Sequence, residues 1–391
     1  MKYVFNSIAT CSSRIGSIKD IDRLPGLVLE TPLVLLYAKG GSVPHLTHEV
    51  LQKVTKVQQP LQIPISTVVN CREAIAAFNK GIADFIGLKE YFTFCSIHDP
   101  AKPTPHGFND KDTVSFWPRT GRKQLDPDKY MDIMETFRPD MYQTLCDGDT
   151  DVNSSKKRIQ KSVDRTSSMF KKCLQRHEKS EVLKKSAVLG VVEGGYCIHA
   201  RQKSAKEVGT SSVFGCVIDG LHNNGAEVEN IPFDQVKPSL RLPLKFLPNE
   251  KFRVVQGCWN PEMVLNLVEM GIDAFDSSFP YAVAERGGAL VFQNKVHHCS
   301  ISDHCHQSDV TLGEGCGSNG VNMEHDSDIL QTNDSKEPDL KKKRIIENTK
   351  DTLVNNGIIN TVSQVLQKKH DDKTQSSSAN TKYEITLSED R

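Results

Sequence analysis

The carboxylate of Asp276 is the side chain of this sequence best placed to do chemistry. It follows an apolar segment, 272–275, that reads as a buried strand, and a helix-like segment, 261–270, precedes that strand. A carboxylate at the carboxyl end of a parallel strand can attack an electrophilic carbon or transfer a proton. The structural alternative is that Asp276 caps a turn together with Ser277 and Ser278.

Short apolar segments of this kind recur over the first ~290 residues and alternate with segments of helical period. The strand-like segments are 33–38, 83–88, 92–97, 141–145, 187–192, 213–218, 252–255 and 272–275, and the helical ones are 72–78, 127–137, 159–174 and 261–270. Such alternation predicts an α/β fold with a parallel sheet. The repetition and length favour a closed, irregular TIM (β/α)₈ barrel over an open doubly wound sheet.

The composition changes at about residue 293. Residues 293–382 contain no Phe, Trp or Tyr and are rich in Ser, Asn, Asp, Lys and His. Such a stretch buries too little apolar area to offset the loss of chain entropy on folding. We therefore expect a barrel over 1–292 and a disordered, low-complexity insert over 293–382. Residues 383–391 recover strand-like alternation, and we expect them to begin a C-terminal module whose remainder is missing.

The charge balance and the cysteines indicate which partners and which cellular compartment to expect. Lys plus Arg equals Asp plus Glu, at 49 each, so no global field attracts nucleic acid and a local patch would be needed. Eleven cysteines are scattered without the spacing of a disulfide scaffold, which indicates a reducing compartment. No signal-peptide pattern and no run of 18 apolar residues occurs. We expect a soluble, cytosolic protein.

Several co-linear segments carry a family resemblance. GVVEGG at 190–195, followed by HARQKSA at 199–205, resembles a strand and helix of the tRNA-guanine (queuine) transglycosylases. FGCVIDGL at 214–221 and the segment 260–276 are similar to later parts of that family. The likeness covers roughly residues 30–292. KGGSVPHLT at 39–47, SIHDP at 96–100 and FPYAVAERG at 279–287 most resemble the eukaryotic accessory subunits of the family.

The resemblance implies a barrel of the transglycosylase type and a site for tRNA. The family exchanges guanine for queuine at wobble position 34 of tRNAs with GUN anticodons, using a carboxylate nucleophile, a second carboxylate for proton transfer and groups that read the base. Asp276 matches the nucleophile, Asp147 the base-reading aspartate, and Gly194 and Gly195 the backbone that approaches the base. Without the resemblance, Asp147 is better explained as part of a turn, and an ordinary turn also explains the two glycines.

Two departures from the family pattern favour a non-catalytic role. The strand end that carries the proton-transfer aspartate in the family, TDSGGFQ, corresponds to FTFCSIH at 92–98, which has no carboxylate. The arginine-rich run after the nucleophile is replaced by PYAVAER at 280–286. We therefore expect no catalytic residue, with Asp276 a vestigial nucleophile, in an accessory subunit that forms a heterodimer with a catalytic homologue. The alternatives are an active transglycosylase that uses Asp276, and an RNA-binding scaffold without a partner.

The basic segment 156–185 is the strongest candidate for a tRNA contact. It carries eleven Lys or Arg residues and an apolar stripe of helical spacing, which predicts an amphipathic helix. Its cations fit a phosphate-facing surface, although a solvated charged face is equally consistent.

The family resemblance also implies a zinc ion and a location. One structural zinc per subunit is held in the family by a CxCxxC motif and a later His. That motif is absent here, so we predict no metal ligand within this chain and expect the ligands beyond Arg391. The resemblance further implies a cytoplasmic location, with a peripheral place at the mitochondrial outer membrane.

Overall fold

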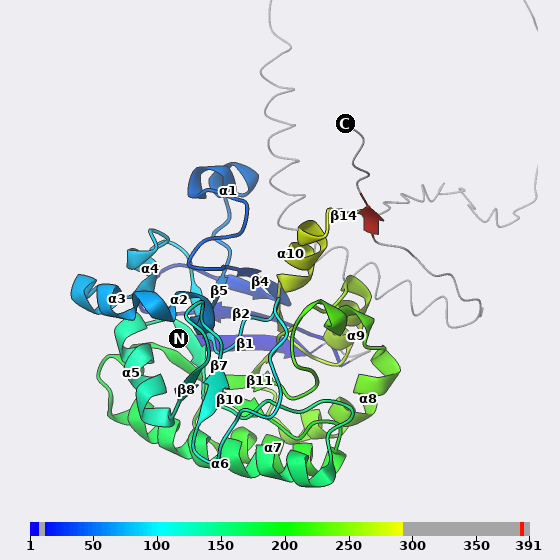
Figure 1. Ribbon diagram of the computed structural model, residues 1–391. Helices are drawn as coiled ribbons and strands as arrows, with labels where there is room; N and C mark the ends of the chain where they lie inside the picture. Colours follow the sequence, from blue (N-terminus) through cyan, green and yellow to red (C-terminus); the bar gives the residue numbers. More distant parts are fainter. Residues whose placement is uncertain (8–11, 292–383, 387–391) are drawn as a thin grey trace, which may run out of the picture.

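A closed barrel of parallel strands forms the centre of the molecule, with helices around it (Figure 1). The computed structural model describes residues 1–7, 12–291 and the backbone of 384–386. The barrel strands are β4 (Leu33–Tyr37), β5 (Leu61–Pro64), β6 (Thr93–Ser96), β9 (Met141–Gln143), β10 (Ala187–Val192), β11 (Gly215–Ile218), β12 (Phe252–Val255) and β13 (Ala274–Asp276). The strands follow one another around the barrel in chain order, and β13 closes it by pairing with β4. The predicted TIM-type α/β barrel is confirmed.

The helices that surround the barrel begin where the sequence offers capping residues. The α-helices of the described residues are α1 (His48–Val54), α2 (Ile65–Val68), α3 (Arg72–Phe78), α4 (Ile82–Phe85), α5 (Pro127–Phe137), α6 (Lys156–Lys179), α7 (Ile198–Thr210), α8 (Phe233–Arg241), α9 (Pro261–Glu269) and α10 (Ser278–Glu285). Short 3₁₀ helices are η1 (Val69–Cys71), η2 (Leu183–Lys185), η3 (Ala226–Asn230) and η4 (Pro243–Phe246). Asp126 caps α5 and Asn260 caps α9, each accepting a hydrogen bond from a backbone N–H of the first turn.

Two barrel elements differ from the sequence prediction. Residues 83–88, expected as a strand, instead form α4 and the turn after it, because Gly81 and Gly87 on either side adopt positive φ values of 88° and 74°. The barrel strand that the sequence did not predict is β5. Its glutamine, Gln62, interrupts the apolar pattern by which the other strands were recognised. The Gln62 side chain is fully buried and donates to Ser96 Oγ at 3.2 Å, so a polar residue occupies a position where an apolar one was expected.

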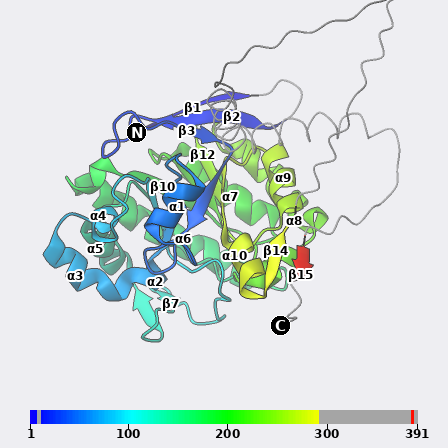
Figure 2. The ribbon, with the colours of Figure 1, turned by 90° about the horizontal axis from the view of Figure 1, so that it is seen from above.

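A three-stranded antiparallel sheet packs against the amino ends of β12 and β13 (Figure 2). Its strands are β1 (Lys2–Ser7), β2 (Arg14–Lys19) and β3 (Leu29–Thr31). Arg14 attaches this sheet to the barrel through a bidentate ion pair with Asp273, in which Arg14 Nε lies 3.0 Å from Asp273 Oδ1. Arg14 also donates to the carbonyls of Asn249 and Lys251 at 2.7 and 3.0 Å. Both charged side chains are buried.

Two further strand pairs lie outside the barrel, β7 (Val114–Phe116) with β8 (Lys123–Leu125) and β14 (Gly288–Leu290) with β15 (Glu384–Thr386). The predicted insert at 293–382 falls entirely outside the described residues, so that prediction stays untested. Among the helices of the described part of the chain, none has the length and apolar character needed to span a bilayer.

Removing Arg14 should destabilise the fold strongly. In Arg14→Ala the carboxylate of Asp273 stays buried without its cation, which typically costs about 3–5 kcal/mol. Lys19→Ala, on the exposed end of the same strand, is the matched control and should change stability by no more than about 0.5 kcal/mol. Urea unfolding followed by circular dichroism measures both, and equal effects of the two substitutions would contradict the role of the buried pair.

Candidate functional site

Five acidic side chains lie at or just after the carboxyl ends of the barrel strands. They are Asp99 after β6, Asp147 after β9, Glu193 after β10, Asp219 after β11 and Asp276 at the end of β13. Because the strands are parallel, these ends share one rim of the barrel. Four of the five are at most 8% exposed, and Asp219 is half-buried. The rim is therefore an acidic, largely desolvated region.

Asp276 is held in place by backbone donors on both oxygens. Its Oδ2 accepts from the N–H of Gly257 at 2.6 Å, and its Oδ1 accepts from the N–H of Ser278 at 2.8 Å. Burial raises the pKa of Asp276 to about 6, although the hydrogen bonds oppose this shift. The side chain is 7% exposed. It occupies the strand-end position predicted for it, but both of its oxygens are already engaged.

A second carboxylate, Asp99, lies near Asp276. The residues 92–98 do lack an acid, but the chain turns back over the rim after β6 and brings in Asp99. Its Oδ1 accepts from the Tyr37 hydroxyl at 2.7 Å and from the N–H of Ala101 at 3.1 Å. The negative charge of Asp99 contributes to the raised pKa of Asp276. Sequence comparison along one strand missed it because the side chain comes from the following loop.

Asp147 is fully buried and already has cationic partners. Arg158 and Arg165, both on α6, donate to its carboxylate; Arg158 does so with two nitrogens, and Arg165 Nη1 lies 3.0 Å from Oδ2. Asn109 Nδ2 adds a third partner at 2.7 Å from Oδ1. A carboxylate that reads a purine needs free acceptor positions facing the base. Here those positions are taken by the protein itself.

Gly194 and Gly195 allow two helices to approach the end of β10. Their φ angles are 133° and 50°, in the region that favours glycine. A Cβ atom at Gly194 would lie 2.4 Å from the backbone nitrogen of Arg201, and one at Gly195 would lie 3.3 Å from Ile159. The carbonyl of Gly195 accepts from Arg201 Nε at 3.0 Å. The surroundings of the glycine pair are thus filled by α6 and α7, and contact with a base remains a prediction.

A cavity of about 360 Å³ opens at the rim beside β4, β5 and β6. It is lined by Lys39, Gly40, Ser66, Thr67, His98, Asp99, Lys102, Pro103, Thr104, Trp117, Pro118 and Arg119. Asp99 faces it, whereas Asp276 and Asp147 do not line it. Burial lowers the pKa of His98, which also lines this cavity. The sequence signal that could have located the cavity is the SIHDP segment.

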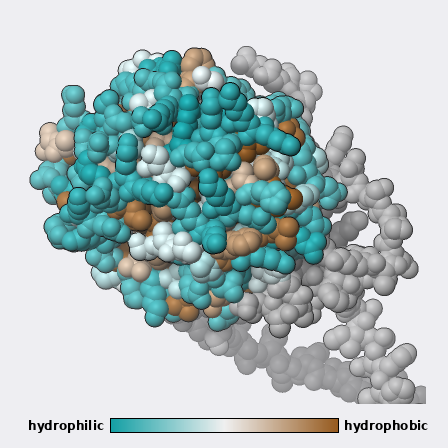
Figure 3. All heavy atoms as spheres, turned by 90° about the horizontal axis from the view of Figure 1, so that it is seen from below, coloured by the Kyte–Doolittle hydropathy of each residue, from teal (hydrophilic) through white to brown (hydrophobic). Residues whose placement is uncertain are grey.

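The predicted amphipathic basic helix is α6, and part of its positive charge is used inside the protein. Besides the two arginines that contact Asp147, Arg176 pairs with Asp128 and Asp132 of α5 at 3.1 and 2.9 Å. Lys156, Lys157 and Lys161 make no ion pair with the described residues. The face of the molecule along which α6 and α7 run is mostly hydrophilic, with smaller apolar areas (Figure 3).

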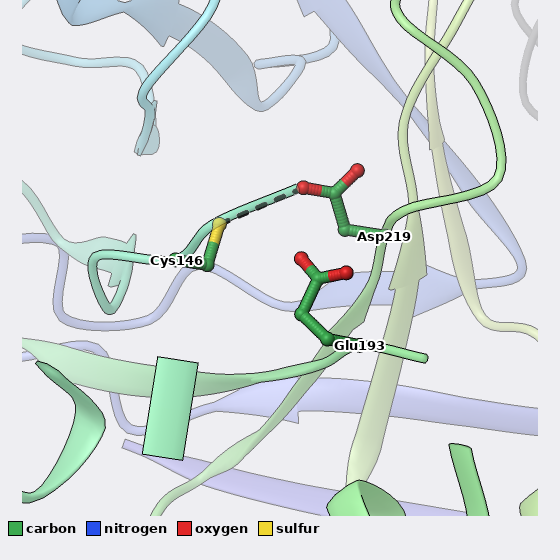
Figure 4. A group of neighbouring side chains, drawn as sticks. All are labelled: Cys146, Glu193 and Asp219. Carbon is green, nitrogen blue, oxygen red and sulfur yellow. Dashed lines mark hydrogen bonds between the residues drawn. The ribbon is translucent and has the colours of Figure 1, made fainter. Parts of the chain in front are cut away.

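One group of side chains at the rim has the composition and spacing of metal ligands. Within the residues that the structure describes, the ligand atoms of Cys146, Glu193 and Asp219 lie within 4.8 Å of one another (Figure 4). Sequence reasoning did not single out this group, because its members come from three different strand ends and no local motif links them.

Asp276 should make stability depend on pH. Its pKa is about 6 in the fold and about 3.9 in an unfolded chain, so the folded state binds more protons between these values. The stabilising contribution is therefore complete below about pH 4 and is lost as the pH rises to about 6. Asp276→Asn lacks this titrating group. The unfolding free energy of the variant should therefore rise by about 2–3 kcal/mol relative to that of the wild type as the pH increases from about 4 to about 6. Urea unfolding at intervals from about pH 4 to 7 measures the difference, and a constant difference would refute it.

Asp147 should be required for stability because it is the anionic partner of Arg158 and Arg165. In Asp147→Asn the guanidinium groups, only 24% and 20% exposed, lose their anionic partner. We expect a loss of about 2–4 kcal/mol, slightly below the cost for a fully buried pair. Asp164→Asn, on the exposed side of α6, is the control and should change the unfolding free energy by no more than about 0.5 kcal/mol. Equal losses in chemical denaturation would show that Asp147 is not the partner that matters.

Comparison with known proteins supports the resemblance inferred from the sequence. The family model described as queuine tRNA-ribosyltransferase matches residues 10–338. A protein of the tick Ixodes scapularis is 40% identical over 283 residues, covering 72% of this chain and 70% of its own. A protein of the frog Xenopus tropicalis is 36% identical over 359 residues, which cover 90% of this chain and 84% of the frog protein. Both are named queuine tRNA-ribosyltransferase accessory subunit 2. With the barrel and these matches together, the chain belongs to the queuine tRNA-ribosyltransferase family.

Proposed function

We propose that this chain is a non-catalytic subunit of a queuine tRNA-ribosyltransferase heterodimer. The catalytic homologue would exchange guanine for queuine at position 34 of tRNAs with GUN anticodons, and this chain would position the tRNA and form the dimer. The names of its relatives support the role of an accessory subunit. The observation that carries the proposal is that side chains of the protein itself donate hydrogen bonds to both carboxylate oxygens of Asp147.

Base exchange needs a free carboxylate edge to recognise the departing and incoming purines. In this chain the equivalent carboxylate accepts hydrogen bonds from Arg158, Arg165 and Asn109. Releasing it would leave two partly buried guanidinium groups without a counter-charge, which is energetically costly. The protein therefore stabilises Asp147 as a structural anion and does not leave it available to a base.

The state of Asp276 supports the same proposal. A nucleophile must present an oxygen lone pair to the anomeric carbon of the ribose. Both Asp276 oxygens accept from backbone N–H groups, and the side chain is absent from the lining of the rim cavity. Asp99 does face that cavity, so an acid is present without an exposed nucleophile beside it. The non-catalytic proposal rests on these contacts and no longer on a missing second carboxylate.

Contact with tRNA is proposed through the lysines of α6. Lys156, Lys157 and Lys161 lie in its first turns and make no ion pair within the described residues. A phosphate contact by each would make binding weaker as salt increases. We further propose a cytoplasmic location and a peripheral place at the mitochondrial outer membrane. The proposed function does not involve the family's zinc ion, because the sequence contains no CxCxxC ligand set.

A base-exchange assay tests the division of labour. We expect no incorporation of labelled guanine into tRNA by this chain alone and full incorporation when the catalytic homologue is added. Asp276→Ala in the mixed complex should leave the rate within about threefold, because a catalytic carboxylate would contribute about 10²–10⁴. Gel filtration of the same samples shows whether the heterodimer is retained.

The alternative function, an active transglycosylase with Asp276 as nucleophile, predicts the opposite pattern. This chain alone would then catalyse exchange, and Asp276→Ala would abolish it while leaving the protein folded. That result would overturn the non-catalytic proposal. A scaffold without a partner would instead bind tRNA with a steep salt dependence and elute from gel filtration as a single subunit in the presence of the homologue.

A further inference from the structure

The side chains of Cys146, Glu193 and Asp219 converge at the rim between three neighbouring strands (Figure 4). Cys146 follows β9, Glu193 follows β10 and Asp219 follows β11. Cys146 Sγ lies 3.6 Å from Asp219 Oδ2. This separation is close to the distance between two ligands of a tetrahedral zinc ion with bonds of about 2.0–2.3 Å.

Glu193 provides the observation that points to a missing ligand. It is completely buried, and neither of its carboxylate oxygens has a hydrogen-bond partner. Its side chain extends from the end of β10 toward Cys146 and Asp219 (Figure 4). Buried polar groups in folded proteins nearly always have a partner, and a buried carboxylate without one is costly. A bound cation would satisfy both oxygens.

Nearby cationic side chains do not fill this role. Arg201 is buried next to Glu193, but its N–H groups donate to the backbone carbonyls of Val192, Gly195 and Asp219. Arg158 is committed to Asp147. Burial is the main reason that the pKa of Glu193 and that of Cys146 are raised well above their ordinary values.

Two glycines provide the space that the carboxylates occupy. A Cβ atom at Gly148 would lie 2.4 Å from Asp219 Oδ2, and one at Gly220 would lie 2.3 Å from Glu193 Oε2. Any side chain at either position would push a carboxylate out of the group. The backbone around the three side chains is thus shaped to admit them at this separation.

We propose that Cys146, Glu193 and Asp219 bind one zinc ion, with a water molecule in the remaining position. A thiolate with two carboxylates suits zinc better than magnesium or calcium, which prefer oxygen ligands alone. The ion would be bound by the Cys146 thiolate and the two carboxylates, any proton on these groups would be released to solvent, and the metal is not oxidised or reduced. The ion would link the ends of β9, β10 and β11. This site is independent of the proposed function and of the CxCxxC zinc motif of the family.

Cobalt substitution tests the site. The full chain would be stripped with a chelator and titrated with Co²⁺, because a cobalt–thiolate bond gives a charge-transfer absorption that carboxylates do not give. The histidines and cysteines of 297–316 could also bind metal, so the background variant carries Cys299→Ser, Cys305→Ser and Cys316→Ser. We expect one equivalent of Co²⁺ with thiolate absorption in this background, and its displacement by Zn²⁺.

Two substitutions test individual ligands, and a third is their control. Cys146→Ser should remove the thiolate band, and Glu193→Gln should weaken zinc binding by more than about 100-fold, since even residues behind a ligand typically contribute 10–100-fold. Cys173→Ser, at a buried thiol of α6 away from the rim, is the matched control and should bind normally. Circular dichroism of the metal-free variants verifies folding. A folded background protein without a thiolate band, or a band that survives Cys146→Ser, would overturn the proposal.

Discussion

Closure of the parallel barrel is the constraint on which the rest of the structure depends. The pairing of β13 with β4 places Asp276 opposite Leu35 and completes a ring in which every strand runs in the same direction. All carboxyl ends then lie on one rim, whatever the separation of the residues in sequence. Acidic residues from five strand ends are therefore brought together, and each requires some means of stabilising its buried charge.

The rim stabilises these charges in different ways. Asp276 accepts from two backbone N–H groups, which orient the carboxylate without neutralising it. Asp147 is neutralised by the guanidinium groups of Arg158 and Arg165. The carboxylate oxygens of Glu193 accept no hydrogen bond from the described residues. The arginines of α6 thus supply the counter-charge of Asp147 from inside the protein.

The periodicity of the sequence was enough to locate most of the barrel. Seven of the eight barrel strands coincide with predicted apolar segments, and α3 and α5 have the predicted ends. The two failures have different causes, and the first is that burial inside a barrel does not require an apolar residue. Gln62 is buried in β5 because Ser96 and Gln256 accept hydrogen bonds from it. Residues 83–88 are apolar but too short to distinguish a strand from a helical turn.

The sequence by itself determined the family, the alternation of strand and helix, and the position of Asp276 at a strand end, because these depend on local pattern and co-linear motifs. Only the tertiary structure decided which side chains meet at the rim. The pairing of Asp147 with two arginines of α6, the approach of Asp99 from a loop and the convergence of Cys146 with Glu193 all join residues that no local pattern connects. Their contacts arise from barrel closure and from the packing of helices against it, which set distances that sequence spacing does not specify.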